Sequence, residues 1–247
     1  MAKYSHDNIV PFKNSELGKK QQVADMFDRI AFRYDFMNRF LSGGIDIRWR
    51  KKAIAELKEI HPQNILDVAT GTADVAIMMA KYLRPKKIIG IDISEGMLSI
   101  GRKKIQELSL NDVIELQIGD SEAIHLPDNS FDAITVSFGV RNFANLEKGL
   151  SEMLRVLRPG GKLVVLEFSK PKQFFFKTIY SIYMKTVAAG AGKLIAKNRE
   201  AYEYLNDSAN AFPEGENFLE ILNKSGYKNT YLKKLTLGVC SIYCGQK

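Results

Sequence analysis

The sequence has few metal-ligating side chains, with two cysteines and three histidines among 247 residues. Cys240 and Cys244 share one face of a strand-like run at a separation of roughly 13 Å, which is too long for a disulfide. We therefore expect reduced thiols, as in a cytosolic protein. No metal site is predicted, because the histidines (His6, His61 and His125) do not have metal-ligand spacing.

Long apolar runs and flexible linkers are also lacking. No run reaches the ~18 apolar residues that a membrane-spanning helix needs. Pro11, Lys13 and Glu16 interrupt the N-terminal segment where a signal peptide would be apolar. No stretch rich in proline, glycine and serine separates two parts of the chain. We expect one cytoplasmic domain over residues 1–247, with residues 1–60 as an N-terminal helical extension.

The chain carries basic residues in excess, with a net charge of +8. Hydrophobic (45%) and charged (26%) contents are those of a globular protein, which excludes disordered and collagen-like classes. Residues 170–199 contain lysines, an arginine and several aromatics but no Asp or Glu. We interpret residues 170–212 as a basic aromatic insertion near the substrate side, which suits a phosphate-bearing partner, either nucleic acid or an anionic membrane surface such as the inner face of the cell membrane. A solvated face or aromatics packed in the core are the alternatives.

Helix and strand patterns alternate after residue 60, which predicts an α/β doubly wound sheet. The expected strands are 65–68, 87–92, 113–118, 131–137 and 161–168, and the expected helices are 73–83, 95–108 and 146–157. Helices at 15–41 and 46–60 precede them, and a helix at 214–224 follows. Two final strand-like runs, 229–235 and 238–244, are too close for a helical crossover, so the sheet is mostly parallel with an antiparallel last strand.

The stretch NILDVATGTAD, residues 64–74, predicts a ligand site. A buried strand gives way to small residues that turn tightly into a helix, whose first N–H groups are free. Asp92 ends the next strand about 20 residues after Gly71, the offset at which a carboxylate binds ribose in dinucleotide-binding folds. Gly71 is the only glycine left of the usual three, so an ordinary strand-to-helix turn is an alternative.

Polar residues follow five strands of the predicted sheet. They are Gly71 and Thr72, Asp92, residues 119–121, residues 137–142 and residues 167–169. Because ligands of open α/β sheets bind outside the carboxyl ends of the strands, we expect all five groups to line one crevice.

Two longer segments resemble a known family. The first contains Tyr34, Asp35, Met37 and Asn38, followed by Ser42, Gly44 and Trp49, and the second is RVLRPGGKLVVLEFS, residues 155–169. Together with LDVATGTAD and SFGVRN they resemble the UbiE/MenG family of S-adenosylmethionine-dependent quinone C-methyltransferases over nearly the whole chain. The resemblance implies a class I methyltransferase (Rossmann-like) fold and S-adenosyl-L-methionine as cofactor.

The resemblance also implies cofactor-binding positions. Gly71 and Thr72 would contact the methionine part, Asp92 the ribose hydroxyls, Asp120 and Ser121 the adenine, and Ser137 the methyl-transfer crevice. A carboxylate can accept hydrogen bonds from two ribose hydroxyls or from the adenine amino group. As an alternative, Asp120 would cap a helix.

Two residues depart from the family pattern. Asp46 stands where the family usually has histidine, so no proton transfer is assigned to it. Ala73 replaces a common glycine, a small change if its backbone is helical.

The family reaction is methylation of a ring carbon of demethylmenaquinol in menaquinone biosynthesis, or of a related benzoquinol precursor of ubiquinone. The resemblance then implies that Arg141 stabilises the developing phenolate while Asn142 and Tyr34 orient the ring hydroxyls. A structural ion pair is the alternative for Arg141. The expected partners are the isoprenoid quinol and an anionic membrane, without nucleic acid, and a homodimer is one compatible oligomeric state.

Two other functions compete with this one. The basic charge favours an RNA methyltransferase, but no added RNA-binding module, Asn-Pro-Pro-aromatic motif or crevice cysteine nucleophile supports it. A non-catalytic S-adenosylmethionine-binding protein is the second, and the polar segment from Ser137 to Asn142 argues against it.

Overall fold

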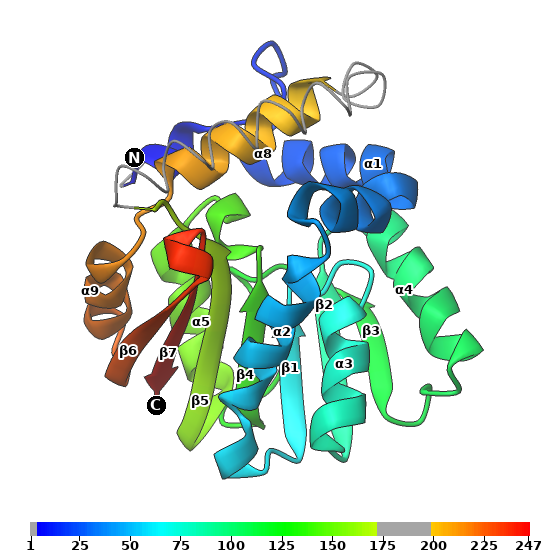
Figure 1. Cartoon of the computed structure of the whole chain (residues 1–247), viewed down its shortest axis with the longest axis vertical. Helices are drawn as coiled ribbons and strands as arrows, with labels where there is room; N and C mark the ends of the chain where they lie inside the picture. The colour runs from blue at the N-terminus through cyan, green and yellow to red at the C-terminus, as the bar shows by residue number, and fades with distance from the viewer. Residues whose placement is uncertain (1–3, 172–198) are drawn as a thin grey trace.

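A computed structural model of the chain describes residues 4–171 and 199–247. Its centre is a seven-stranded sheet of order β3-β2-β1-β4-β5-β7-β6 (Figure 1). The strands are β1 (Asn64–Val68), β2 (Lys87–Asp92), β3 (Ile114–Ile118), β4 (Phe131–Ser137), β5 (Leu157–Phe168), β6 (Lys228–Leu235) and β7 (Cys240–Gln246). The first five pair in parallel, whereas β7 runs antiparallel between β5 and β6.

Helices cover both faces of the sheet. On one face lie α2 (Ile45–Ala55), α3 (Asp74–Leu83) and α4 (Glu95–Glu107), and on the other lie α5 (Leu146–Val156) and α9 (Glu216–Lys224). Successive side chains of a strand point to opposite faces, so β5 sends Val164 and Leu166 into the first apolar cluster and Leu163 and Val165 into the second. Burial on both faces explains why these strands read as continuous apolar runs.

A third layer crosses the edge at which the five parallel strands end. It consists of α1 (Lys19–Ser42) and α8 (Arg199–Ala211), which lie along the top of the molecule in Figure 1. Val23, Met26 and Ile30 of α1 share an apolar cluster with Met97 of α4 and Tyr204 of α8. This layer places side chains of α1 and α8 over the strand ends.

Short 3-10 helices complete the described chain: η1 (Ser5–Asn8), η2 (Lys58–Ile60), η3 (Val140–Asn142) and η4 (Thr236–Gly238).

The predicted fold class is confirmed, including the antiparallel last strand. Strands 87–92 and 131–137 have the predicted bounds, but the first helix begins at Lys19 and the second ends at Ala55. Strand β5 begins at Leu157, because Phe131 of β4 pairs with that residue before a bulge. Of the basic insertion 170–212, residues 172–198 lie outside the described residues, and residues 199–211 form α8, which the patterns did not predict.

Both cysteines are free and buried on β7. Among residues 4–171 and 199–247, no helix combines the length and apolar character needed to cross a membrane.

Candidate active site

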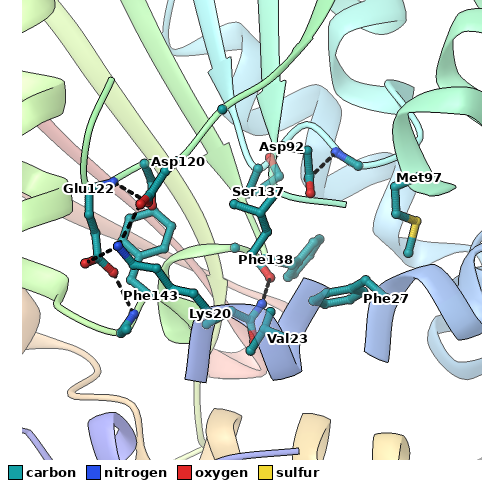
Figure 2. A pocket seen from close by; sticks show the side chains of 18 of the residues that line it. Lys20, Val23, Phe27, Asp92, Met97, Asp120, Glu122, Ser137, Phe138 and Phe143 are labelled. Atoms are coloured by element: carbon teal, nitrogen blue, oxygen red, sulfur yellow. Dashed lines mark hydrogen bonds and ion pairs between the residues drawn. The ribbon is translucent and has the colours of Figure 1, made fainter. Parts of the chain in front are cut away.

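Two cavities adjoin beneath α1 at the carboxyl ends of the strands. The larger encloses about 660 Å³, including space open to solvent, and the smaller about 400 Å³. Both are lined by Tyr34, Ala69, Gly71, Ser137 and Phe138, so these residues form their common border. Figure 2 shows the larger cavity, with Phe27 and Val23 of α1 facing Ser137, Asp92 and Asp120 of the sheet edge.

The turn after β1 has an unusual backbone. Ala69, Gly71 and Ala73 all have positive φ, at 54°, 56° and 64°. Only glycine adopts this region without penalty, and each alanine costs about 1–2 kcal/mol there. Ala73 is therefore left-handed rather than helical, so the condition under which its replacement of glycine would be a small change is not met. The turn brings Ala69 and Gly71 to the wall of both cavities, and Thr70 and Thr72 to the wall of the smaller one.

Asp92, at the end of β2, holds this turn. One carboxylate oxygen accepts a hydrogen bond from the Gly71 N–H (2.8 Å) and the other accepts one from the Ser94 N–H (2.9 Å). Asp92 lines the larger cavity and is nearly buried. Burial raises the pKa of its carboxyl group to about 6. Each carboxylate oxygen can accept a further hydrogen bond, as binding of ribose hydroxyls requires.

Asp120 and Ser121 line the far end of the same cavity. Asp120 forms an ion pair with Lys20 of α1 at 2.7 Å, and Lys20 also reaches Glu122 at 2.8 Å (Figure 2). The second Asp120 oxygen accepts from the Glu122 N–H at 2.8 Å. This contact closes a turn rather than a helix, so the helix-cap alternative for Asp120 is wrong.

Thr72 belongs to the smaller cavity. Its hydroxyl donates a hydrogen bond to Asp35 of α1 at 2.7 Å, and Lys104 of α4 donates to both Thr72 (3.1 Å) and Asp35 (2.5 Å). Asp35 thus connects the first segment of the resemblance to the turn after β1.

Arg141 lies behind the larger cavity. Its Nη1 donates to Glu167 at 2.6 Å and to the Phe138 carbonyl at 2.7 Å, and both charged side chains are buried. Burial raises the pKa of Glu167 in spite of this partner. Neither residue lines the two cavities, and the expectation that residues 167–169 belong to the crevice stays a prediction. The ion pair that was the alternative for Arg141 is present.

Asn142 and Tyr34 do reach the larger cavity. The Tyr34 ring packs edge-to-face against Phe27, with centroids 5.7 Å apart. The Asn142 side-chain oxygen accepts from the Tyr204 hydroxyl of α8 at 3.1 Å. Sequence reasoning missed Tyr204 and Lys20, because their partners lie 62 and 100 residues away and no local pattern links them.

The residues present fit S-adenosylmethionine. The larger cavity combines two carboxylates, Asp92 and Asp120, with the apolar side chains of Phe27 and Met97, which suits an adenosine group. The smaller cavity combines Thr72 with charged side chains, which suits the amino-acid end of the same molecule. Fold and site together define a class I S-adenosylmethionine-dependent methyltransferase.

Comparisons with known proteins place the chain more closely. The profile of the ubiE/COQ5 methyltransferase family matches residues 15–247, and the chain belongs to this family. It is 46% identical to a demethylmenaquinone methyltransferase of Bacteroides fragilis, with 99% of each chain covered. It is 44% identical to a ubiquinone/menaquinone biosynthesis C-methyltransferase of Geobacter sulfurreducens, covering 93% of this chain and 90% of the relative.

A solved structure shares the fold. A Methanococcus maripaludis protein described as a putative S-adenosyl-L-methionine-dependent methyltransferase superposes with a TM-score of 0.63 at 18% identity, covering 96% of this chain and 97% of that one. The sequence-based predictions of the family, of methyl transfer and of S-adenosylmethionine as cofactor are confirmed.

The raised pKa of Asp92 predicts pH-dependent cofactor binding. Above pH 6 the carboxylate is charged and accepts ribose hydroxyls, whereas protonation at lower pH removes acceptors, so the affinity for S-adenosylhomocysteine should fall as pH drops through about 6. Asp92→Asn should bind about 10- to 100-fold more weakly at pH 7.5 and lose most of this dependence. Isothermal titration calorimetry between pH 5 and 8 measures both effects. An unchanged pH profile in the variant would assign the dependence to another group, such as Asp67, whose pKa burial also raises to about 6.

Proposed function

We propose that this protein methylates a ring carbon of a demethylmenaquinol, using S-adenosylmethionine, to give menaquinol in menaquinone biosynthesis. The observation that carries this proposal is the 46% identity over 99% of both chains to a relative named demethylmenaquinone methyltransferase. The Geobacter relative's name also includes ubiquinone biosynthesis, so a benzoquinol precursor is the second candidate substrate.

We propose that the larger cavity holds both the adenosine end of the cofactor, at Asp92 and Asp120, and the ring, at Tyr34 and Asn142. S-adenosylmethionine, when bound, supplies an electrophilic methyl group. A ring carbon becomes nucleophilic when a neighbouring hydroxyl loses its proton, and the ring must lose a second proton after the C–C bond forms. We propose that Tyr34 and Asn142 orient the ring hydroxyls, because both line the cavity next to Ser137, with the apolar Phe143 and Val23 against the ring.

Arg141 is the proposed source of positive charge near the phenolate. Its Nη1 is held by Glu167 and the Phe138 carbonyl, while its Nη2 donates no hydrogen bond to any residue of the described ranges. Because Arg141 lines neither cavity, we propose that Nη2 acts on the substrate oxygen through an ordered water. Glu167 in turn fixes the guanidinium plane and keeps the buried charge balanced.

Activity should depend on the quinol ring. The protein is incubated with methyl-labelled S-adenosylmethionine and each candidate substrate. Label should enter a demethylmenaquinol within minutes and enter a benzoquinol precursor at the same rate or more slowly. No label should enter transfer or ribosomal RNA. Organic extraction followed by mass spectrometry locates the label on the ring. Methylation of RNA, or cofactor binding without transfer to either quinol, would contradict the proposal in favour of the two competing functions.

Removal of Arg141 should reduce turnover without affecting the cofactor. We expect Arg141→Ala to lower kcat by about 100-fold or more while the affinity for S-adenosylhomocysteine changes less than twofold. The single variant leaves Glu167 charged and unpaired, which costs about 3–5 kcal/mol of stability, so Arg141→Met with Glu167→Gln is the folded control. If that double variant keeps full turnover, or if either variant loses cofactor affinity, the assignment of Arg141 is wrong.

We also propose a cytoplasmic protein that contacts the anionic inner surface of the membrane, where isoprenoid quinols reside. The support is the basic and aromatic sequence of residues 170–199.

Sedimentation with anionic vesicles tests this contact. Binding should be clear at 50 mM salt, fall strongly at 500 mM and be absent with neutral vesicles. Changing Lys172, Lys177 and Lys185 to Gln should weaken it, whereas the matched change of the exposed Lys51, Lys52 and Lys58 should not. Equal loss in both triple variants would show a general charge effect, contrary to the proposal.

A further inference from the structure

Arg50 is a buried cation that the reaction as described does not use. It lies on α2, lines the smaller cavity and is 6% exposed. Its Nη1 donates to Asp74 at 2.8 Å, and its Nε lies 3.7 Å from Asp46, beyond hydrogen-bond distance. Nε is buried without a hydrogen-bond partner, and Nη2 donates no hydrogen bond to any residue within 4–171 or 199–247, so the guanidinium of this cavity wall has donors without a protein partner.

The other two cations near this cavity are already occupied. Arg39 is 41% exposed and uses its amino groups on Asp46 (3.5 Å) and Asp74 (3.2 Å). Lys104 donates to Asp35, Thr72 and Asp74. Arg50 is therefore the buried cation of this group whose Nη2 has no partner among the described residues, whereas both amino groups of the exposed Arg39 are paired.

Charges of both signs surround the smaller cavity. Three basic side chains (Arg39, Arg50 and Lys104) pair with three carboxylates (Asp35, Asp46 and Asp74), and Asp67 adds a fourth carboxyl group. Asp67, on the cavity wall, accepts hydrogen bonds from Thr70 and Thr135. A site of this kind favours a zwitterion over a simple anion or cation, because each end finds an opposite charge. The methionine part of the cofactor carries an α-ammonium and an α-carboxylate.

We infer that Arg50 binds the α-carboxylate of S-adenosylmethionine through Nη2. The adenosine end is then in the larger cavity at Asp92 and Asp120, and the chain between the two ends passes the common border at Gly71 and Tyr34. Asp74 orients the guanidinium by holding Nη1, and Asp46 supports it from the Nε side. This gives a role to Asp46, which stands where the family usually has histidine.

A purely structural ion pair makes a different prediction. Arg50 and Asp74 join α2 to the start of α3, so their loss could loosen the whole site and weaken every ligand alike. Carboxylate binding instead affects only ligands that carry the carboxylate. S-adenosylhomocysteine, the product formed from the cofactor, carries the adenosine, the α-ammonium and the α-carboxylate. Decarboxylated S-adenosylhomocysteine lacks only the carboxylate, and 5′-methylthioadenosine lacks the whole amino-acid end.

Calorimetric titration of the full chain with these three ligands distinguishes the two roles. Arg50→Gln should weaken S-adenosylhomocysteine by about 10- to 100-fold and change the two carboxylate-free ligands by less than twofold. The affinity of Arg50→Lys for S-adenosylhomocysteine should lie between that of Arg50→Gln and that of the native chain, because a lysine keeps the charge but lacks the planar arrangement of guanidinium donors. Arg48→Gln, on the exposed side of the same helix, is the matched control and should leave all three affinities unchanged.

Two results would overturn the inference: equal weakening of all three ligands, or native affinity of Arg50→Gln for S-adenosylhomocysteine. Should Arg50→Gln not fold, Arg50→Lys still decides, because a carboxylate contact requires a larger loss for S-adenosylhomocysteine than for its decarboxylated form. No quinol enters these titrations, so their outcome is independent of the proposed substrate.

Discussion

The buried carboxylate of Asp92 is the contact on which the site depends. It joins the ends of β1 and β2 by accepting the Gly71 and Ser94 N–H groups, and so it holds a turn that contains three left-handed residues. Hydrogen bonds to a charged group contribute about 1.5–3 kcal/mol each, enough to offset the backbone penalty of Ala69 and Ala73. Without this carboxylate the turn would relax, and the common border of the two cavities would be lost.

Helix α1 covers this site with contacts of a weaker kind. Along one side of the helix, Lys20 meets Asp120, Asp28 accepts from Ser94 and Gly96, and Asp35 meets Thr72. The Lys20–Asp120 pair is more than a third exposed on average, and such pairs contribute only about 0–1 kcal/mol. An adenine amino group can therefore share or replace the Lys20 contact at little cost, whereas the Asp92 contacts persist. The site thus combines the buried contacts of Asp92, which stay in place, with exposed contacts of α1 that a ligand can replace.

The sequence predicted what local pattern and topology determine. Apolar runs and their spacing gave the bounds of β2 and β4, and the rule that ligands bind at strand ends brought Gly71, Asp92, Asp120 and Ser137 together correctly. The partners of individual side chains could not be predicted from the sequence. Arg141 and Glu167, for example, lie at the ends of two different strands, and their pairing depends on side-chain rotamers rather than on sequence spacing. Helix α8 was not predicted, because residues 170–212 were interpreted by their basic and aromatic composition alone. Ala201 and Tyr204 nevertheless pack at helical spacing.

Several side chains of the two family segments contact other parts of the protein. In the first, Asp35 binds Thr72, Asp46 supports Arg39 and Arg50, and the Trp49 N–H donates to Thr236 at 2.7 Å, so these side chains serve the cofactor end and the sheet. In the second segment, Glu167 forms an ion pair with Arg141. Tyr34 of the first segment lines the larger cavity, but its proposed role is with the ring hydroxyls, which both quinols carry. Because ring size is sensed by apolar contact, discrimination falls to residues outside both segments that line the larger cavity, chiefly Val23, Phe27 and Phe143.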